Sequence, residues 1–427
     1  MPETNLLNNS HIAIIGLGYV GLPVAHMLSQ HFRVTGYDID TNRIAELKNS
    51  KDTNNEIQHE ELLKSKAEFT DNIKDIKGCN IYILTIPTPI DHYFQPDLTL
   101  LSDACKNIGA FIQKGDLIIF ESTVYPGVSE DVCAPIIEKQ SGLKSGHDFF
   151  IGYSPERINP GDTKNTLSTI TKVVAGQTPQ ITEIMAALYG TINNGNIFKA
   201  GSIKVAEAAK AIENAQRDIN VAFINEITMV LNKMGITASD ALEAAKTKWN
   251  FLPFTPGLVG GHCIGVDPYY MAKAAMKHGH TPQMILAGRH INDSMGAFFA
   301  NQIHDQIAPK SNILILGFTF KENISDIRNT KTIEVIRTLK QSGHNVHVHE
   351  PNADKARVKK EYGIELIEKI DDFAPYDAIG LLVAHDNYKN MPINDIANIA
   401  NTNALIYDIK SIWNQYDWPA NIRYKQL

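Results

Sequence analysis

The stretch that decides the fold is His11-Ile-Ala-Ile-Ile15, followed at once by Gly16-Leu-Gly18-Tyr-Val-Gly21. The apolar run predicts a buried strand, and the sequence pattern after the glycines predicts a helix over residues 19–31. In this context the glycines permit a tight turn and close approach of a pyrophosphate, while the helix N-terminus offers backbone N–H groups to the anion. A plain glycine-rich turn is the alternative interpretation.

A second predicted strand, residues 33–37, ends in Asp38, and 38 − 16 gives a spacing of 22 residues. This is the spacing of a carboxylate that binds the ribose hydroxyls of a dinucleotide. The negative charge of Asp38 would repel the additional phosphate of NADP. The sequence therefore predicts NAD as the cofactor.

In the rest of the chain, sequence patterns that predict strands alternate with patterns that predict helices. The length of 427 residues corresponds to two or three domains at roughly 150 residues each. An Ala-rich segment from 199 to 234 is longer than an average helix. The predicted fold class is α/β, with two Rossmann-like parallel-sheet domains joined by a helical middle domain that contains a long central helix. The expected boundaries are an NAD-binding domain over 1–198, a helical middle domain over 199–300 and a second Rossmann-like domain over 301–427. The apolar runs that predict strands cover 12–15, 81–86, 117–120, 149–151, 172–175, 312–316, 346–349, 378–383 and 404–407.

Composition narrows the class of protein. Hydrophobic residues make up 43% and charged residues 20% of the chain, and the formal net charge is −7. This mixture is typical of a folded globular protein, and the absence of a long basic run argues against a nucleic-acid partner. No apolar stretch approaches membrane-spanning length, so we expect no membrane partner and a cytoplasmic location. The cysteines Cys79, Cys105, Cys133 and Cys263 are scattered without metal-ligand spacing, which predicts free thiols and no metal site.

One of these cysteines lies in an unusual segment, Gly260-Gly-His-Cys263-Ile-Gly265-Val-Asp267-Pro268. Flanking glycines remove side-chain bulk around the sulfur, and a thiolate is nucleophilic enough to add to an aldehyde. Cys263 is therefore the candidate nucleophile, with a small buried thiol as the alternative. Asp267 precedes a proline and a helical run, so a helix N-cap is its structural alternative.

Five ordered motifs over roughly residues 10–415 resemble the successive signatures of the nucleotide-sugar 6-dehydrogenases, a family that includes UDP-glucose and UDP-N-acetylhexosamine dehydrogenases. The stretch from Trp249 and the one around Cys263 resemble the N-acetylhexosamine branch more closely. The motifs are Gly16-Leu-Gly18-Tyr-Val-Gly21-Leu-Pro, Glu121-Ser-Thr-Val-Tyr-Pro-Gly127, Ser154-Pro-Glu-Arg-Ile-Asn-Pro-Gly161, Gly260-Gly-His-Cys-Ile-Gly-Val-Asp-Pro268 and Gly317-Phe-Thr-Phe-Lys-Glu-Asn-Ile-Ser-Asp-Ile-Arg328.

The resemblance implies an oxidation of the C6 alcohol of the sugar to a carboxylate, which uses two NAD in succession. Cys263 would capture the aldehyde as a thiohemiacetal, the second oxidation would give a thioester, and water would release the uronic acid.

The resemblance also places catalytic groups on the middle helix. Lys210 and Asn214 stand four residues apart and project from one helix face, with Arg217 on the same stripe. Lys210 would stabilise alkoxide charge, Asp267 would help a water accept the proton, and Asn214 would donate a hydrogen bond to the oxyanion. For a lysine on a helix, a solvated face is the structural alternative.

For thioester hydrolysis the resemblance implies Glu156 as the base and Thr123 as a water-positioning partner. A turn carboxylate paired with the neighbouring Arg157 is the alternative interpretation of Glu156.

Further contacts follow from the same resemblance. In the last domain, Lys321 would contact the sugar nucleotide and Arg328 would contact the cofactor. A lysine ammonium suits a phosphate as a point charge, and a planar guanidinium suits bidentate phosphate contact. The alternative is that both are solvent-exposed residues of a loop. The stretch from 251 to 257 would cover the substrate, or be a structural connection only. The implied cofactor contacts are Gly16, Gly18, Tyr19, Val20, Gly21, Asp38, Arg43, Thr85, Pro87, Thr88, Ser122, Thr123 and Arg328. The implied substrate contacts are Glu156, Arg157, Lys210, Asn214, Arg217, Phe254, Gly257, Gly260 and Lys321.

Several questions stay open at the level of sequence. UDP-N-acetylglucosamine is the first choice of substrate, and UDP-N-acetylgalactosamine, UDP-N-acetylmannosamine and UDP-glucose are alternatives, since one inverted hydroxyl is distinguished by a few hydrogen bonds. A two-electron dehydrogenase of the hydroxyacid type and a non-catalytic dinucleotide sensor are the less favoured functions. Family similarity implies a homodimer through the middle helices and a role in surface polysaccharide synthesis.

Overall fold

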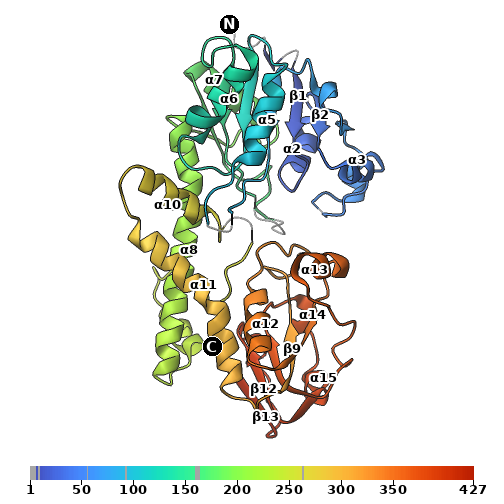
Figure 1. Ribbon diagram of the computed structural model, residues 1–427, viewed down its shortest axis with the longest axis vertical. Helices are drawn as coiled ribbons and strands as arrows, with labels where there is room; N and C mark the ends of the chain where they lie inside the picture. Colours follow the sequence, from blue (N-terminus) through green and yellow to red (C-terminus); the bar gives the residue numbers. More distant parts are fainter. Residues whose placement is uncertain (1–5, 8–9, 55, 92–93, 159–163, 262–263) are drawn as a thin grey trace. The chain divides into compact units, whose positions relative to one another are not determined.

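The computed structural model describes residues 6–7, 10–54, 56–91, 94–158, 164–261 and 264–427 (Figure 1). The chain forms two compact units. The first comprises Met1–Glu213 with Tyr269–Thr281, and the second comprises Asn214–Pro268 with Pro282–Leu427. The three-domain boundaries at residues 198 and 300 remain a prediction.

The first unit is built on an eight-stranded sheet in the order β3-β2-β1-β4-β5-β6-β7-β8. Its strands are β1 His11–Ile15, β2 Arg33–Tyr37, β3 Glu68–Thr70, β4 Ile81–Leu84, β5 Leu117–Phe120, β6 Phe150–Tyr153, β7 Lys172–Gly176 and β8 Ile197–Lys199. Its helices are α2 Gly21–Leu28, α3 Thr41–Lys48, α4 His59–Leu62, α5 Thr99–Gly109, α6 Ala134–Ser141 and α7 Pro179–Gly190, with shorter helical turns η1 Ile73–Ile76 and η2 Val128–Cys133.

Helices cover both faces of this sheet, as a strand that is apolar on both sides requires. In β1, Ala13 and Ile15 face a core that includes side chains of α5 and α6. Ile12 and Ile14 face the opposite core, which includes side chains of α2 and α7. The predicted doubly wound α/β fold is therefore confirmed, and it places the turn after β1 at the carboxyl edge of the sheet.

One part of the sheet differs from the expected parallel arrangement. β7 pairs with β6 in the antiparallel direction, through Gly152 with Gly176 and Tyr153 with Ala175. The described residues between these two strands contain no helix. Because no helix among the described residues of this connection carries the chain back to the other end of the sheet, β7 begins at the end where β6 finishes.

The second unit contains a five-stranded parallel sheet in the order β10-β9-β11-β12-β13. Its strands are β9 Asn312–Leu316, β10 Asn345–His349, β11 Tyr376–Leu381, β12 Ala400–Asp408 and β13 Ile422–Gln426. Side chains of α11 Gln283–His304 and α12 Thr332–Gln341 pack on one face, and those of α14 Asp386–Lys389 and α15 Ile393–Asn398 on the other. The remaining helices of this unit are α9 Ala238–Lys246 and α13 Lys355–Tyr362.

Two helices contribute residues to both units. α8 spans Ile203–Lys233, which is 31 residues, and so confirms the predicted long central helix. α10 spans Asp267–Lys277 and begins at the aspartate and proline that predict a helix start. None of the helices in the described part of the chain is long and apolar enough to cross a membrane.

Candidate active site

The glycine-rich turn after β1 has the geometry that a dinucleotide requires. Gly16 has a φ of +95°, which favours glycine, and a Cβ built on Gly21 would lie 1.8 Å from the Gly16 carbonyl oxygen. A Cβ on Gly18 would meet no atom within 4 Å. The first glycine thus makes the turn, the third allows close packing, and the middle one leaves the backbone accessible to a pyrophosphate. The neighbouring Val20 is buried and Tyr19 half-buried.

Asp38 and Arg43 both contact the turn through Leu17. Asp38 Oδ2 accepts a hydrogen bond of 2.7 Å from the Leu17 N–H, and Arg43 Nε donates to the Leu17 carbonyl at 3.0 Å. Arg43 Nη1 also pairs with Asp52 at 2.7 Å. Arg43 Nη2 is buried and has no hydrogen-bond partner among the described residues. These two side chains therefore hold the turn in place, and the contact of Asp38 with a ribose stays a prediction.

The ends of β4 and β5 supply the other predicted cofactor contacts of this unit. Thr85 Oγ1 donates to the Gly16 carbonyl at 2.6 Å, and Thr88 Oγ1 donates to the Thr123 carbonyl at 2.6 Å. Ser122 Oγ is buried without a hydrogen-bond partner in the part of the chain that the structure describes. Pro87 is exposed. With an open Gly18, a carboxylate at the second strand and an unsatisfied hydroxyl, these residues fit a nicotinamide dinucleotide.

Glu156 and Lys210 form a buried ion pair in the first unit. The distance between Glu156 Oε2 and Lys210 Nζ is 3.7 Å, and the two residues are 4% and 5% exposed. Glu156 also accepts a hydrogen bond from the Ile158 N–H. The alternative pairing of Glu156 with Arg157 is not formed, because Arg157 instead pairs with Glu213 at 2.9 Å. The alternative that Lys210 is a solvent-exposed lysine on a helix surface is also wrong, because the residue is buried.

Glu207, one helical turn before Lys210, was not indicated by the sequence. Its carboxylate accepts hydrogen bonds from the Gly127 N–H at 2.5 Å and the Ser129 N–H at 2.9 Å. Burial raises the pKa of Glu207 to about 7, an effect that outweighs the opposing one of these N–H donors. Glu207 thus ties α8, which carries Lys210, to the loop that follows Thr123.

In the second unit, Asn214 and Asp267 are in direct contact. Asn214 Nδ2 donates to Asp267 Oδ2 at 2.5 Å, and the two residues are 4% and 2% exposed. The amide of Asn214 therefore orients the carboxylate that begins α10. Arg217, on the same helix, is exposed.

Cys263 and His262 lie outside the described residues, so the structure does not test the candidate nucleophile. The glycines just before it are explained by packing. A Cβ on Gly260 would lie 2.8 Å from the Asn329 carbonyl oxygen, and one on Gly261 would lie 2.8 Å from the ring of Phe320. The segment that leads to Cys263 is thus held against the loop between β9 and α12.

A pocket in the second unit combines Gly260 and Lys321 with Lys410, which the sequence did not indicate. Lys410 follows Asp408 at the end of β12, and a Cβ on Gly257 would lie 2.7 Å from Lys410 Nζ. Burial lowers the pKa of Lys410, although the nearby Glu322 and Asp408 oppose this shift. A lysine two residues after the carboxyl end of a parallel strand is the signal that could have found it.

The loop that carries Gly257 is fixed by an amide on α8. Asn225 Oδ1 accepts from the Gly257 N–H at 2.9 Å, and Asn225 Nδ2 donates to the Gly257 carbonyl at 3.1 Å. Asn225 Nδ2 also donates to Asn292 Oδ1 at 2.8 Å. Phe254 in the same loop is half-buried. The predicted substrate-covering loop is therefore anchored at its glycine.

Arg328 is engaged within its own loop. Its Nε and Nη2 donate to both oxygens of Asp326, at 2.6–3.0 Å. Across both units, the described residues contain no group of three or more His, Cys, Asp or Glu side chains that could hold a metal ion.

The predicted residues that contact one another thus form separate clusters within each unit. In the first unit they are the glycine turn, Asp38, the ends of β4 and β5, and the Glu156–Lys210 pair. In the second unit they are the Asn214–Asp267 pair and the pocket with Gly260 and Lys321.

Comparison with known proteins places these features in context. Sequence profiles of the UDP-glucose/GDP-mannose dehydrogenase family match along the chain: the NAD binding domain over residues 10–193, the central domain over 204–294 and the UDP binding domain over 314–415. The chain is 47% identical over 411 residues to a UDP-N-acetyl-D-glucosamine 6-dehydrogenase of Pseudomonas aeruginosa, covering 95% of this chain and 97% of that protein. It is 46% identical to Protein CapL of Staphylococcus aureus, covering 95% and 97%.

Solved structures of similar proteins have the same fold as this chain. The UDP-D-ManNAc dehydrogenase of Pyrococcus horikoshii superposes with a TM-score of 0.86 at 28% identity, covering 97% of this chain and 98% of that one. The UDP-N-acetyl-mannosamine dehydrogenase Cap5O of Staphylococcus aureus gives a TM-score of 0.82 at 26% identity, covering 98% of each chain.

Proposed function

Because the chain belongs to the UDP-glucose/GDP-mannose dehydrogenase family, we propose that it oxidises C6 of UDP-N-acetylglucosamine from the alcohol to the carboxylate, with two NAD. The general activity, an NAD-dependent UDP-sugar dehydrogenase, follows from the family. The choice of sugar rests on the relatives at 47% identity, both of which are named for UDP-N-acetyl-D-glucosamine.

The observation that carries this proposal is the burial of Lys210 beside Glu156. A lysine and a carboxylate that are both removed from water lose solvation energy, which a surface pair does not. In a reaction centre, the lysine of such a pair can stabilise negative charge and the carboxylate can accept a proton.

The first oxidation needs a group that stabilises the alkoxide of the sugar. We assign Lys210 to this role, with Asp267 directing a water that accepts the proton and Asn214 holding the carboxylate of Asp267 in place. NAD, bound at the Gly16–Gly21 turn, supplies the hydride acceptor in each of the two oxidations. Arg328 is assigned to the cofactor as well.

The second half of the reaction belongs to Cys263 and Glu156. The Cys263 thiolate adds to the aldehyde carbon and the oxygen takes up a proton, which gives a thiohemiacetal. Loss of a hydride and a proton converts this to a thioester. Glu156, with Thr123, removes a proton from water as the water attacks the thioester carbon, so that the uronic acid leaves and the thiol is regenerated.

The nucleotide sugar is assigned to the basic and glycine-rich residues of the site. Lys321 and Lys410, which line one pocket in the second unit, suit a diphosphate. The other assigned contacts are Arg157, Arg217, Phe254, Gly257 and Gly260.

We also propose a cytoplasmic homodimer that forms through α8. Val205, Ile212, Phe223 and Val230 are each 47–57% exposed. Their spacings of 7, 11 and 7 residues keep them within a narrow stripe along one side of a helix. NAD and UDP-sugars are both cytoplasmic metabolites, and the uronate product suits surface polysaccharide synthesis.

The test is an NADH assay with UDP-N-acetylglucosamine, UDP-N-acetylgalactosamine, UDP-N-acetylmannosamine and UDP-glucose side by side. We expect the highest kcat/KM with UDP-N-acetylglucosamine and loss of uronate formation in Cys263→Ser. Highest kcat/KM with another of the sugars would contradict the choice of substrate. Full activity of Cys263→Ser would indicate a hydroxyacid-type mechanism, and failure to bind any UDP-sugar would indicate a dinucleotide sensor.

A further inference from the structure

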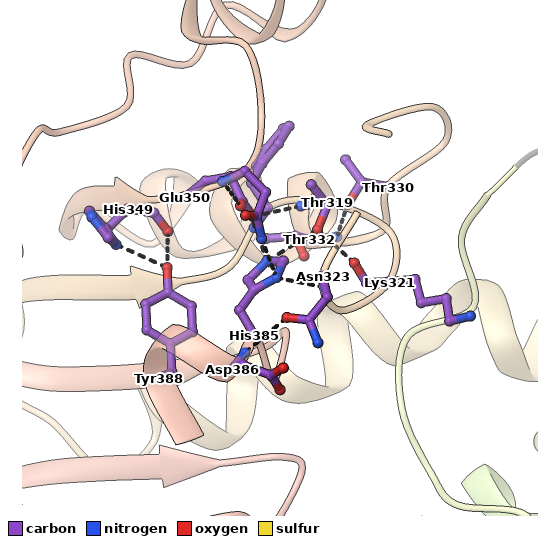
Figure 2. A network of polar contacts seen from close by, with 12 residues as sticks. Thr319, Lys321, Asn323, Thr330, Thr332, His349, Glu350, His385, Asp386 and Tyr388 are labelled. Atoms are coloured by element: carbon purple, nitrogen blue, oxygen red, sulfur yellow. Dashed lines mark hydrogen bonds and ion pairs between the residues drawn. The ribbon is translucent and has the colours of Figure 1, made fainter. Parts of the chain in front are cut away.

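His385 is the centre of a buried polar cluster in the second unit (Figure 2). It follows β11, precedes α14 and is 0% exposed. Its ring contacts two segments that are distant in sequence, namely the loop after β9, at Asn323, and the residues just beyond β10, at Glu350 and Asn352. A histidine with partners at both ring nitrogens holds one orientation.

The partners of His385 determine where its proton lies. Nδ1 accepts from the Asn323 N–H at 2.9 Å and from Asn352 Nδ2 at 2.8 Å. A nitrogen that accepts a backbone N–H carries no proton, so the proton of the neutral ring is on Nε2. Nε2 lies 2.9 Å from Glu350 Oε2 and therefore donates to that carboxylate.

Glu350 occupies the same topological place as Asp38, at the end of the second strand of its sheet. Glu350 Oε2 accepts from the Phe318 N–H at 2.7 Å, just as Asp38 Oδ2 accepts from the Leu17 N–H at 2.7 Å. Glu350, however, is also bonded to the Thr319 N–H and His385 and is 2% exposed. It is therefore not available to a ribose, and serves to hold the loop after β9.

Lys321 lies between the anchors of this loop. Thr319 Oγ1 donates to the Lys321 carbonyl at 2.8 Å, and the Asn323 N–H binds His385. The side chain of Lys321 points away from the cluster (Figure 2), and it lines the pocket that contains Gly260 and Lys410.

We propose that His385 is a positioning residue for binding of the nucleotide sugar. It accepts the Asn323 N–H at Nδ1 and thereby fixes the backbone from which Lys321 reaches the substrate. This inference rests on the proposed function of Lys321. His385 touches neither the substrate nor the cofactor itself.

Two substitutions separate the acceptor of His385 from its donor. In His385→Gln the amide N–H₂ replaces Nε2 and still binds Glu350, but the acceptor for Asn323 is lost. In His385→Asn the side-chain oxygen replaces Nδ1, so that the acceptor is retained and the donor to Glu350 is lost. We expect the KM for the UDP-sugar to rise about five- to tenfold in His385→Gln, the loss expected for one buried hydrogen bond. His385→Asn should restore most of the affinity, and the KM for NAD should stay the same in both.

A double-substitution cycle tests whether His385 acts through Lys321. In a Lys321→Met background, His385→Gln should raise the KM for the UDP-sugar by less than twofold, because the side chain that it positions is already absent. A full additional rise in this background would overturn the proposal. So would an unchanged KM in His385→Gln alone.

A second variant covers the case in which His385→Gln does not fold. Thr319→Val removes the hydroxyl that donates to the Lys321 carbonyl and that also lies 3.2 Å from His385 Nε2, while the carboxylate of Glu350 that pairs with His385 is kept. The KM for the UDP-sugar should therefore rise in the same way. His347→Gln, at a histidine that stacks on Phe373, is the matched control. An unchanged KM in Thr319→Val would overturn the proposal, whereas a wild-type protein that oxidises no UDP-sugar would instead contradict the proposed function.

Discussion

Glu156 and Lys210 face each other at 3.7 Å, from a turn after β6 and from the first half of α8. They are separated by 54 positions in the sequence (210 − 156) and are both almost fully buried. If this pair belongs to the reaction centre, removal of the ammonium group should affect turnover much more than substrate affinity.

We expect Lys210→Met to lower kcat at least 100-fold, because the alkoxide and the Glu156 carboxylate both lose their compensating charge. Steady-state kinetics with NAD and the UDP-sugar measure this. Lys204→Met is the control, since Lys204 is on the same helix in an exposed pair with Asp131. A loss of similar size in Lys204→Met would show that the effect is not specific to the buried pair.

The glycine turn predicts two different outcomes for two similar substitutions. In Gly18→Ala the added methyl group enters open space, so stability should be unchanged while the Kd for NADH rises at least tenfold. In Gly21→Ala the methyl group would lie 1.8 Å from a backbone oxygen, so both stability and NADH affinity should fall. Fluorescence titration with NADH and thermal unfolding distinguish these cases. Wild-type affinity for NADH in Gly18→Ala would contradict the assigned binding mode.

The amide of Asn225 gives a prediction for the substrate-covering loop. Asn225→Asp replaces the donor to the Gly257 carbonyl and to Asn292 by a second acceptor, which leaves those oxygens facing a buried carboxylate. The free energy of unfolding should fall by about 2–4 kcal/mol and the KM for the UDP-sugar should rise. The matched control is Asn220→Asp. Asn220 is on the same helix, and its amide donates one exposed hydrogen bond, to the Gln216 carbonyl. Equal effects of the two variants would argue against a specific clamp.

Glu207 predicts a pH dependence of stability. Its pKa is raised from an ordinary 4.5 to about 7 in the folded protein, mainly by burial. Between these values the folded state binds more protons than the unfolded state, so Glu207 makes stability fall as pH rises through this window. Glu207→Gln cannot titrate, and the difference in unfolding free energy between wild type and variant should change by on the order of 3 kcal/mol from pH 4 to pH 8.

Chemical denaturation across this pH range measures the effect of Glu207. Glu183→Gln, at an exposed carboxylate paired with Lys199, should show no such change. If Glu207→Gln and wild type had parallel pH profiles, the raised pKa of Glu207 would be refuted.

The sequence predicts best those structural features that are determined by residues close together in the chain. Four-residue apolar runs such as 117–120 are buried on both faces, and this is why they could be recognised as strands. The glycine turn could be recognised because the three glycines that its backbone geometry needs lie within six consecutive residues, 16–21. The strands that were missed include more exposed or polar positions, and each is the edge strand of its sheet: Glu68–Thr70, Ile197–Lys199 and Ile422–Gln426.

What the sequence could not predict depends on contacts between distant residues. Glu207 binds the backbone at Gly127, 80 positions away, and His385 binds the backbone at Asn323, 62 positions away. Lys410 lies beside Gly257 only because β12 ends there. A buried carboxylate or histidine has no pattern of its own in sequence, since its partners are backbone groups that every residue possesses.

The central claim is a four-electron oxidation through a thioester on Cys263. The most direct test is the stoichiometry of NADH formed per UDP-N-acetylglucosamine consumed, with the product identified by mass spectrometry. We predict two NADH for each uronate, with no free aldehyde. One NADH per substrate, with an aldehyde or ketone as the final product, would contradict the account.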